Sequence, residues 1–157
     1  MSSSATALLC AGVAVVLTGC GSHSDPQARG VSDLTESNRA VVADFVDLMY
    51  RQKNVRAAFM KHVAVDYVQH NPNIADGRDA AIAALEPMFS RPEASFDVKR
   101  VLVDGDLAAV DLHGRPSSDA AGGAVVDLFR LEHGKIVEHW DVLQPIPATA
   151  ENPHPMF

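Results

Sequence analysis

The sequence predicts an α+β fold, in which N-terminal helices pack against a curved antiparallel sheet. Between Ser37 and Phe89, apolar residues recur at helical spacing. After Ser95 the chain changes to β-branched and aromatic segments separated by turn sequences, which are typical of β-hairpins. The length of 157 residues and the absence of an internal repeat favour one domain, so helices and strands should share one core.

The chain begins with a segment that resembles a bacterial lipoprotein signal. Ala5–Leu17 is apolar but short for a mature membrane-spanning helix, as is typical of secretion signals. It ends in Leu17-Thr18-Gly19-Cys20, which resembles a lipobox and implies cleavage before Cys20 and lipid on its thiol. We therefore expect a protein of the bacterial cell envelope, lipid-anchored to the membrane. Because residues 1–4 lack Lys and Arg, one alternative is a cytoplasmic protein whose start codon lies further downstream.

The composition divides the chain into four parts. Residues 1–19 form the expected signal peptide, and residues 20–36 are rich in Ser, Gly and Pro, which predicts a flexible tether. Residues 37–147 form the folded domain, and residues 148–157 form a proline-rich tail.

Three helices are predicted in the first half of the domain. Ser37 is a suitable N-cap for a helix over residues 38–52, and a short second helix should span residues 54–62. A third helix should run to Phe89, capped by Asp76 or Asp79 and ended or kinked by Pro87.

The strands are predicted from their composition and from the turns between them. A short strand over residues 66–69 should precede a turn at Asn71-Pro72-Asn73, because Pro72 cannot donate a backbone hydrogen bond. The other strands form two hairpins, joined at Asp104-Gly105 and at Glu132–Lys135. Their predicted strands are Ser95–Val103 with Leu107–His113, and Val125–Leu131 with Ile136–Leu143.

The register of the second hairpin determines which side chains share a face. If Leu131 pairs with Ile136 and alternation continues, Asp127 faces Trp140. His139 and Asp141 then point to the opposite face, so Asp127 and Asp141 should not enter one cavity.

Composition argues against several functional classes. The net charge of -7 and the absence of a basic stripe argue against nucleic acid as a partner. No two of the seven histidines lie at ligand spacing on an obvious common face, so we expect no metal site. P-loop, dinucleotide-binding and Gly-x-Ser-x-Gly motifs are also absent, and we expect no cofactor.

Two motifs resemble the SnoaL-like branch of the NTF2-like superfamily, which includes polyketide cyclases. They are Tyr67-Val68-Gln69-His70-Asn71-Pro72 with the following Gly77, and Asp127–Arg130 continuing through Gly134–Val142. The resemblance spans about Ser37 to Pro147. It implies a cone-shaped α+β barrel that often forms a homodimer through its sheets. Relatives close polyketide rings by aldol chemistry, isomerise steroids, open epoxides or only bind ligands.

Asp127 and His70 are the leading candidates for catalysis. A carboxylate inside an apolar cone can remove a proton next to a carbonyl, and His70 could act as acid, base or enolate donor. The alternatives are an edge carboxylate paired with Lys or Arg for Asp127, and a loop histidine bonded to a carbonyl for His70.

Four further residues are candidates for ligand binding. Asp141 lies within the family-like Trp-Asp pair, but a surface ion pair is an alternative. His113 could be a second donor in the cavity, and Tyr67 could donate a hydrogen bond or simply belong to the core. Trp140 should pack against a ligand. His139 and Glu138 are expected to be solvated.

These observations lead to two functional hypotheses. The first is a membrane-tethered domain that binds a small apolar molecule and carries out cofactor-independent acid/base chemistry, either aldol-type cyclisation or isomerisation. The alternative is a non-catalytic envelope lipoprotein that binds a small apolar ligand or a partner.

Overall fold

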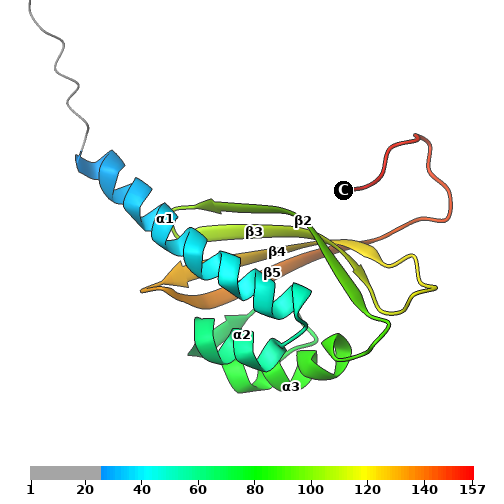
Figure 1. The fold of residues 1–157 in the computed structure, drawn as a ribbon, viewed down its shortest axis with the longest axis horizontal. Coiled ribbons are helices and arrows are strands. Elements are labelled where there is room, and N and C mark those ends of the chain that lie inside the picture. The colour runs from blue at the N-terminus through cyan, green and yellow to red at the C-terminus, as the bar shows by residue number, and fades with distance from the viewer. Residues whose placement is uncertain (1–25) are drawn as a thin grey trace, which may run out of the picture.

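The computed structural model describes residues 26–157, which form helices and a five-stranded sheet (Figure 1). The helical elements are α1 (Pro26–Val46), a π-helical turn η1 (Asp47–Arg51), α2 (Val55–His62) and α3 (Arg78–Phe89). The strands are β1 (Val63–Gln69), β2 (Ser95–Asp104), β3 (Leu107–Arg115), β4 (Gly123–Glu132) and β5 (Lys135–Pro145). The predicted α+β fold class and the two predicted hairpins are confirmed.

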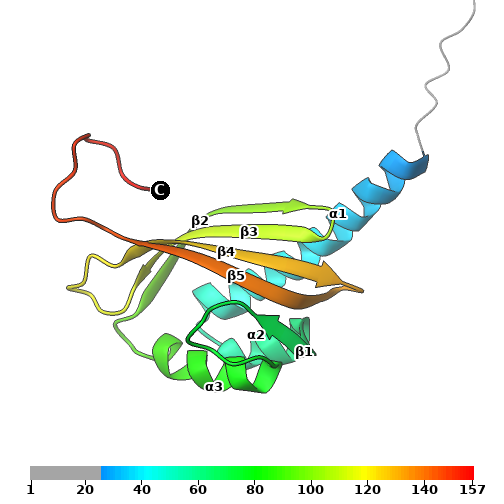
Figure 2. The same cartoon turned by 180° about the vertical axis from the view of Figure 1, so that it is seen from behind.

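The strands are arranged in the order β1-β5-β4-β3-β2. Neighbours are antiparallel except at one edge, where β1 runs parallel to β5. Helices α2 and α3 lie on one side of the sheet, with β1 beside them (Figure 2). We call the sheet face toward the helices the inner face and the opposite one the outer face. The buried core lies between the helices and the inner face.

Helix α1 begins earlier than the sequence predicted. It starts at Pro26 rather than near Asn38, so the second part of the predicted tether is helical. Asn38 is buried, and its side-chain amide is satisfied by donating to the carbonyl of Gly105 in the β2–β3 turn. In the part of the helix that the sequence did not predict, the hydroxyl of Thr35 accepts the backbone amide of Gly105 at 2.9 Å. The predicted signal peptide and Cys20 lie outside the described residues.

The turn η1 brings Tyr50 into the core. The amide of Gln52 donates to the carbonyl of Asp47 at 2.9 Å, an i to i−5 bond that widens the helix locally. Met49 and Tyr50 are neighbours in sequence, yet both are buried there. Wide turns of this kind are frequent at functional sites.

The start of α3 also differs from the prediction. Its N-cap is Gly77, with a positive φ of 94°, and neither predicted aspartate caps it. The Gly77 amide donates to the carbonyl of Tyr67 at 2.7 Å, and the Asp76 carboxylate instead accepts from the amide of Gln69 at 2.8 Å. Both bonds hold the loop after β1 against that strand.

The predicted register of the second hairpin is wrong because β5 contains a bulge. Leu131 pairs with Ile136 as predicted, but Arg130 pairs with Glu138, so Val137 is an extra residue on β5. A bulge places two residues of one strand opposite one of its partner and shifts the alternation of faces. Beyond the bulge, Asp127 pairs with Asp141 instead of facing Trp140.

None of the helices within residues 26–157 combines the length and the apolar composition that a membrane crossing requires.

Candidate functional site

A cavity of about 600 Å³ lies between the helices and the inner face of the sheet. Its wall is largely aromatic and aliphatic, with side chains from α1, η1, α2, α3 and the strands. These include Phe45, Met49, Phe59, Ile74, Leu85, Met88, Phe89, Phe96, Leu112, Val125 and Phe129. Cavities of this size and character are typical small-molecule sites.

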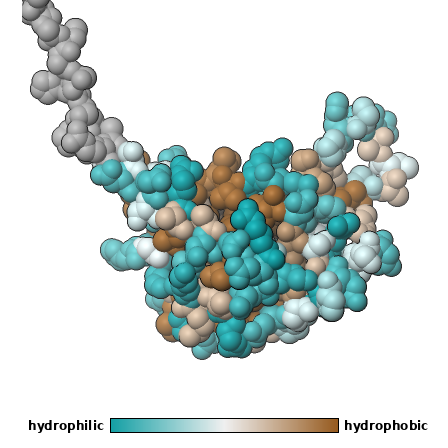
Figure 3. Space-filling view, viewed as in Figure 1, coloured by the Kyte–Doolittle hydropathy of each residue, from teal (hydrophilic) through white to brown (hydrophobic). Residues whose placement is uncertain are grey.

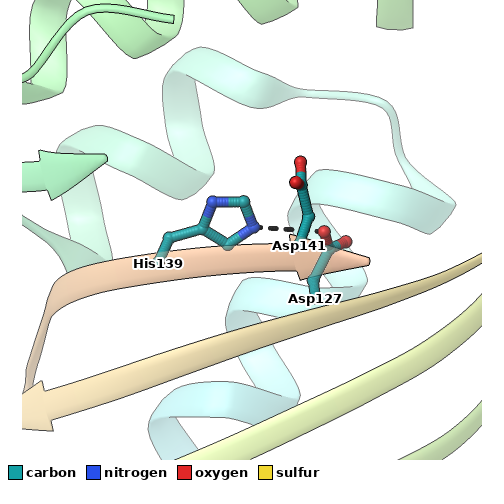
Figure 4. Close-up of side chains that lie close together, drawn as sticks. All are labelled: Asp127, His139 and Asp141. Carbon is teal, nitrogen blue, oxygen red and sulfur yellow. Dashed lines mark hydrogen bonds and ion pairs between the residues drawn. The ribbon is translucent and has the colours of Figure 1, made fainter. Parts of the chain in front are cut away.

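Polar side chains interrupt this apolar wall in one region. Asp127 of β4 and His139 and Asp141 of β5 project from the same face of the hairpin (Figure 4). Each offers a ligand atom within 4.8 Å of those of the other two. They share this face because of the bulge, which turns His139 and Asp141 inward.

Asp127 is buried and has two side-chain partners. The hydroxyl of Tyr50 donates to its Oδ2 at 2.6 Å, and Nε2 of His139 lies 3.1 Å from its Oδ1. His139 is also buried, between the rings of Tyr67 and Phe129, whose centroids lie 6.5 Å and 5.1 Å from its own. The two side chains therefore form a buried carboxylate–imidazole pair at the cavity wall.

The loop after β1 supplies two amide side chains to the same region. Gln69 Oε1 lies 2.8 Å from His139 Nδ1 and accepts the backbone amide of Asn71 at 2.9 Å. The side-chain amide of Asn71 donates to Asp141 Oδ2. The loop thus contacts both residues that β5 contributes to the cluster.

Two tyrosine hydroxyls in the cavity wall stay protonated. Burial, followed by the neighbouring Asp127 carboxylate, raises the pKa of Tyr50 well above its usual value. Burial is also the main reason that the pKa of Tyr67 is raised, and the charge of Asp127 adds to it. Tyr67 accepts from Gln69 Nε2 at 3.3 Å, so its hydroxyl proton remains to donate to a bound molecule.

The structure does not bring His70 and Asp127 together, in contrast to the expectation from the sequence. His70 does not line the cavity; its ring stacks on Trp140, with centroids 4.7 Å apart, and its Nε2 lies 2.8 Å from Glu138 Oε1. Glu138 and Trp140 point to the outer face, because they alternate with the inward His139 and Asp141. Trp140 therefore lines a shallow hollow on the outer face and not the cavity.

The other candidates divide between the two faces. Tyr67 and Asp141 line the cavity. His113 does not: its Nε2 lies 2.7 Å from the carbonyl of Ala121, and its ring stacks on Phe157 of the C-terminal tail. The placement of Asp141 away from Asp127 and the placement of His113 in the cavity were both wrong.

Sequence reasoning missed His139, Tyr50, Gln69 and Asn71. His139 was expected to be solvated, because regular alternation after Ile136 turns it outward. No local pattern in β5 marks the bulge. Tyr50 follows Val46 and Met49 on the apolar stripe of its helix, and that position could have indicated a buried hydroxyl near the sheet.

The cluster could hold a cation only by giving up hydrogen bonds. Asp127, His139 and Asp141 are close enough for a shared ion. However, Tyr50 already donates to Asp127, Asn71 donates to Asp141, and His139 Nε2 lies against Asp127 Oδ1. Hydrogen bonding accounts for the arrangement, so we do not assign these side chains as metal ligands.

Comparisons with known structures agree on the fold. An NTF2-like protein of unknown function from Mesorhizobium loti superposes with a TM-score of 0.62 at 23% identity, covering 70% of this chain and 93% of that one. A proposed ketosteroid isomerase from Kribbella flavida DSM 17836 superposes with a TM-score of 0.59 at 22% identity, covering 77% of this chain and 85% of that one. A proposed SnoaL-like polyketide cyclase from Jannaschia sp. CCS1 superposes with a TM-score of 0.57 at 22% identity, covering 70% of this chain and 87% of that one. No significant match is found among curated proteins.

The family model for the SnoaL-like domain matches residues 42–139. That range covers most of the folded domain, from the buried half of α1 to His139 in the cavity wall. The chain therefore belongs to the SnoaL-like domain family and has the NTF2-like fold.

Proposed function

We propose that this domain binds a small apolar carbonyl compound in the cavity and transfers a proton next to the carbonyl without a cofactor. The observation that carries the proposal is the Asp127–His139 pair, buried in the wall of an otherwise apolar cavity of about 600 Å³. Proton transfer next to a carbonyl requires a base and a hydrogen-bond donor for the developing enolate oxygen. Carboxylate, imidazole and tyrosine hydroxyl groups here supply both.

The structural neighbours support this class of reaction. One is described as a proposed ketosteroid isomerase and another as a proposed SnoaL-like polyketide cyclase. Isomerisation through an enolate and ring closure through an aldol step both begin with removal of a proton beside a carbonyl. His70 has no place in this proposal, because it lies outside the cavity.

The substitution Asp127→Asn tests the proposal. Mass spectrometry of the purified domain would first identify a bound molecule, and its turnover would then be measured. Asp127→Asn should lower turnover by about 10²- to 10⁴-fold, the usual contribution of a positioned acid or base. Asp111→Asn is the matched control: Asp111 lies on β3, pairs with Arg100 and does not line the cavity. Turnover by Asp127→Asn at the wild-type level would refute the proposal.

A second candidate function is ligand binding without catalysis. It is favoured by one observation: the polar groups of the cavity wall bond mainly to one another, as a network that only closes the core would do. In that case the wild-type domain would bind the identified molecule but leave it chemically unchanged.

We also propose attachment to the bacterial cell envelope through lipid on Cys20. The support is the lipobox-like sequence Leu17-Thr18-Gly19-Cys20 after an apolar segment. Fractionation of cells that express the Cys20→Ala variant tests this: the protein should leave the membrane fraction, and an unchanged distribution would refute the anchor.

A homodimer is the remaining partner proposal. Its support is the outer face of the sheet, where large apolar side chains are exposed and a shallow hollow is lined by Leu102, Leu107, Leu128 and Trp140. Figure 3 shows brown side chains grouped over the sheet, on the side away from α2 and α3. Exposed apolar areas of this kind often mark protein interfaces.

A further inference from the structure

The loop after β1 determines how the side chain of Gln69 is oriented. The backbone amide of Asn71 donates to one terminal atom of Gln69 at 2.9 Å. A backbone N–H can only donate, so that atom must be the carbonyl oxygen Oε1. The other terminal atom is then the nitrogen, which lies 3.3 Å from the Tyr67 hydroxyl and can donate to it.

This orientation determines where His139 carries its proton. Nδ1 of His139 lies 2.8 Å from Gln69 Oε1, which has no hydrogen to give. Nδ1 must therefore be the donor. Because a neutral imidazole has one N–H, Nε2 has no hydrogen unless the ring takes up a second proton.

The contact between His139 and Asp127 then requires a proton of its own. Nε2 lies 3.1 Å from Asp127 Oδ1, and an unprotonated imidazole nitrogen facing a carboxylate oxygen would place two lone pairs against each other. Tyr50 donates to the other oxygen of Asp127, so it cannot satisfy this contact. One proton must lie between Nε2 and Oδ1, as an imidazolium–carboxylate or an imidazole–carboxylic acid pair.

Asp141 is held differently by the same loop. The backbone amide of Asn73 donates to Asn71 Oδ1 at 2.9 Å, which leaves the side-chain nitrogen of Asn71 to donate to Asp141 Oδ2. Within residues 26–157, Asp141 Oδ1 has no hydrogen-bond donor. Since Asp141 lines the cavity, this oxygen is available to accept a proton from a bound molecule.

We propose that Gln69 is a positioning residue that holds the His139 proton on Nδ1, so that the Asp127–His139 pair stores one transferable proton and Asp141 is the proton acceptor. This inference rests on the proposed function and divides its acid and base roles among named atoms.

The resulting step balances in protons and electrons. Asp141 Oδ1 takes the proton from the carbon beside the carbonyl, and its carboxylate becomes a carboxylic acid. The electron pair of the broken C–H bond forms a carbon–carbon double bond, and the carbonyl π pair moves to the oxygen. That oxygen receives the proton stored between His139 and Asp127, which gives a neutral enol. Isomerisation is completed when Asp141 returns its proton to another carbon. The enol hydroxyl at the same time gives its proton back to the His139–Asp127 pair, so the carbonyl re-forms and both groups recover their starting protonation.

Nitrogen-15 and carbon-13 NMR of the protein without added substrate tests the assignment at neutral pH. In the wild type, Nδ1 of His139 should be protonated, either Nε2 or the Asp127 carboxyl should carry the second proton, and Asp141 should be a carboxylate. A His139→Gln variant assigns the ring signals. An unprotonated Nδ1, a His139–Asp127 pair without the extra proton, or a protonated Asp141 would each overturn the proposal.

Two variants of Gln69 separate positioning from general structural support. Gln69→Glu keeps an oxygen that accepts from Nδ1 and should preserve the wild-type tautomer. Gln69→Leu removes that oxygen, so the neutral ring should carry its proton on Nε2 and donate to Asp127. Retention of the Nδ1 proton in Gln69→Leu would overturn the role of Gln69. The NMR signals are measured without turnover, so they can be recorded even if the domain proves to be non-catalytic. If a Gln69 variant does not fold, the wild-type spectrum alone tests the proposal.

Discussion

The bond between Tyr50 and Asp127 is the interaction in the cavity wall for which single atoms matter most. Both residues are buried, and the hydroxyl lies 2.6 Å from Oδ2. A carboxylate inside an apolar wall is stable only while its oxygens are hydrogen-bonded, because burial without a partner costs free energy. The bond from the Tyr50 hydroxyl to Asp127 Oδ2 therefore contributes both to the stability of the fold and to the proposed chemistry of Asp127.

We expect Tyr50→Phe to lower the free energy of unfolding by about 1–3 kcal/mol, the cost of leaving a buried acceptor without its donor. Urea denaturation followed by circular dichroism measures the difference.

Tyr67→Phe is the matched control for that substitution. Tyr67 is also buried in the cavity wall, but its hydroxyl accepts only a long bond of 3.3 Å from Gln69. It should cost less than about 1 kcal/mol, because little bonding is lost. If both variants lower the free energy of unfolding equally, the bond from Tyr50 to Asp127 contributes no more to stability than the long bond of Tyr67.

At the scale of elements, the bulge in β5 decides what the site contains. Composition and turn sequences predicted both hairpins and the Leu131–Ile136 pair, because those features are local. The bulge at Val137 depends on how β5 fits between β1 and β4, and no residue type in β5 marks it in advance. One such residue changed the expected partner of Asp127 from Trp140 to Asp141.

The same limit explains the other errors. His70 was expected in the cavity because it follows a strand and precedes a turn. That position in the chain is correct. The sequence does not show which face of β1 its side chain follows. Helix α1 was predicted too short for a similar reason, since Thr35 gains its bond to Gly105 only when the β2–β3 turn is present.

Helix α1 holds the β2–β3 turn from two positions. Asn38 donates to the carbonyl of Gly105 at 2.8 Å, and the amide of Gly105 donates to the hydroxyl of Thr35 at 2.9 Å. Asn38→Ala should lower the free energy of unfolding by about 1–3 kcal/mol, because it leaves a carbonyl without its donor. Glu36→Ala, on the exposed side of the same helix, should change it by less than about 0.5 kcal/mol. Thermal denaturation of both variants provides the comparison, and equal effects would refute this role for Asn38.

The loop after β1 is joined to β5 on the outer face by an acid-sensitive contact. Hydrogen bonds from His70 and from Arg130 lower the pKa of Glu138. A carboxyl whose folded pKa lies below its unfolded pKa of about 4.3 stabilises the fold fully above that value, and the contribution is lost as pH falls through the folded pKa. Glu138→Gln should therefore lower the melting temperature at pH 7 but have little effect near pH 2.

Melting temperatures of the wild type and of Glu138→Gln between pH 2 and pH 7 measure this dependence. Glu132→Gln is a suitable control, because Glu132 is more exposed and contacts Arg130 at 3.6 Å. A constant difference between wild type and Glu138→Gln across this pH range would contradict the expected linkage.

At the scale of the whole molecule, the two faces of the sheet have different surroundings. The inner face is covered by helices and encloses the cavity. On the outer face, Leu102 is 66% exposed and Val142 is 63% exposed, and Phe157 of the tail covers only the area near His113. The cavity and the outer face lie on opposite sides of the sheet, so an outer-face dimer would not supply residues to the cavity.

We expect the domain to be a dimer in solution through this outer face, and Leu102→Glu to make it monomeric. A stable interface buries roughly 800 Å² on each partner, and a charge introduced within its apolar area would have to be desolvated without a partner. Met60→Glu is the control, because Met60 is 51% exposed but lies on α2, away from the outer face. Light scattering after size-exclusion chromatography gives the mass of each variant. A monomeric wild type, or a Leu102→Glu variant that remains dimeric, would exclude this interface. Because the cavity opens within one chain, the Leu102→Glu monomer should retain ligand binding.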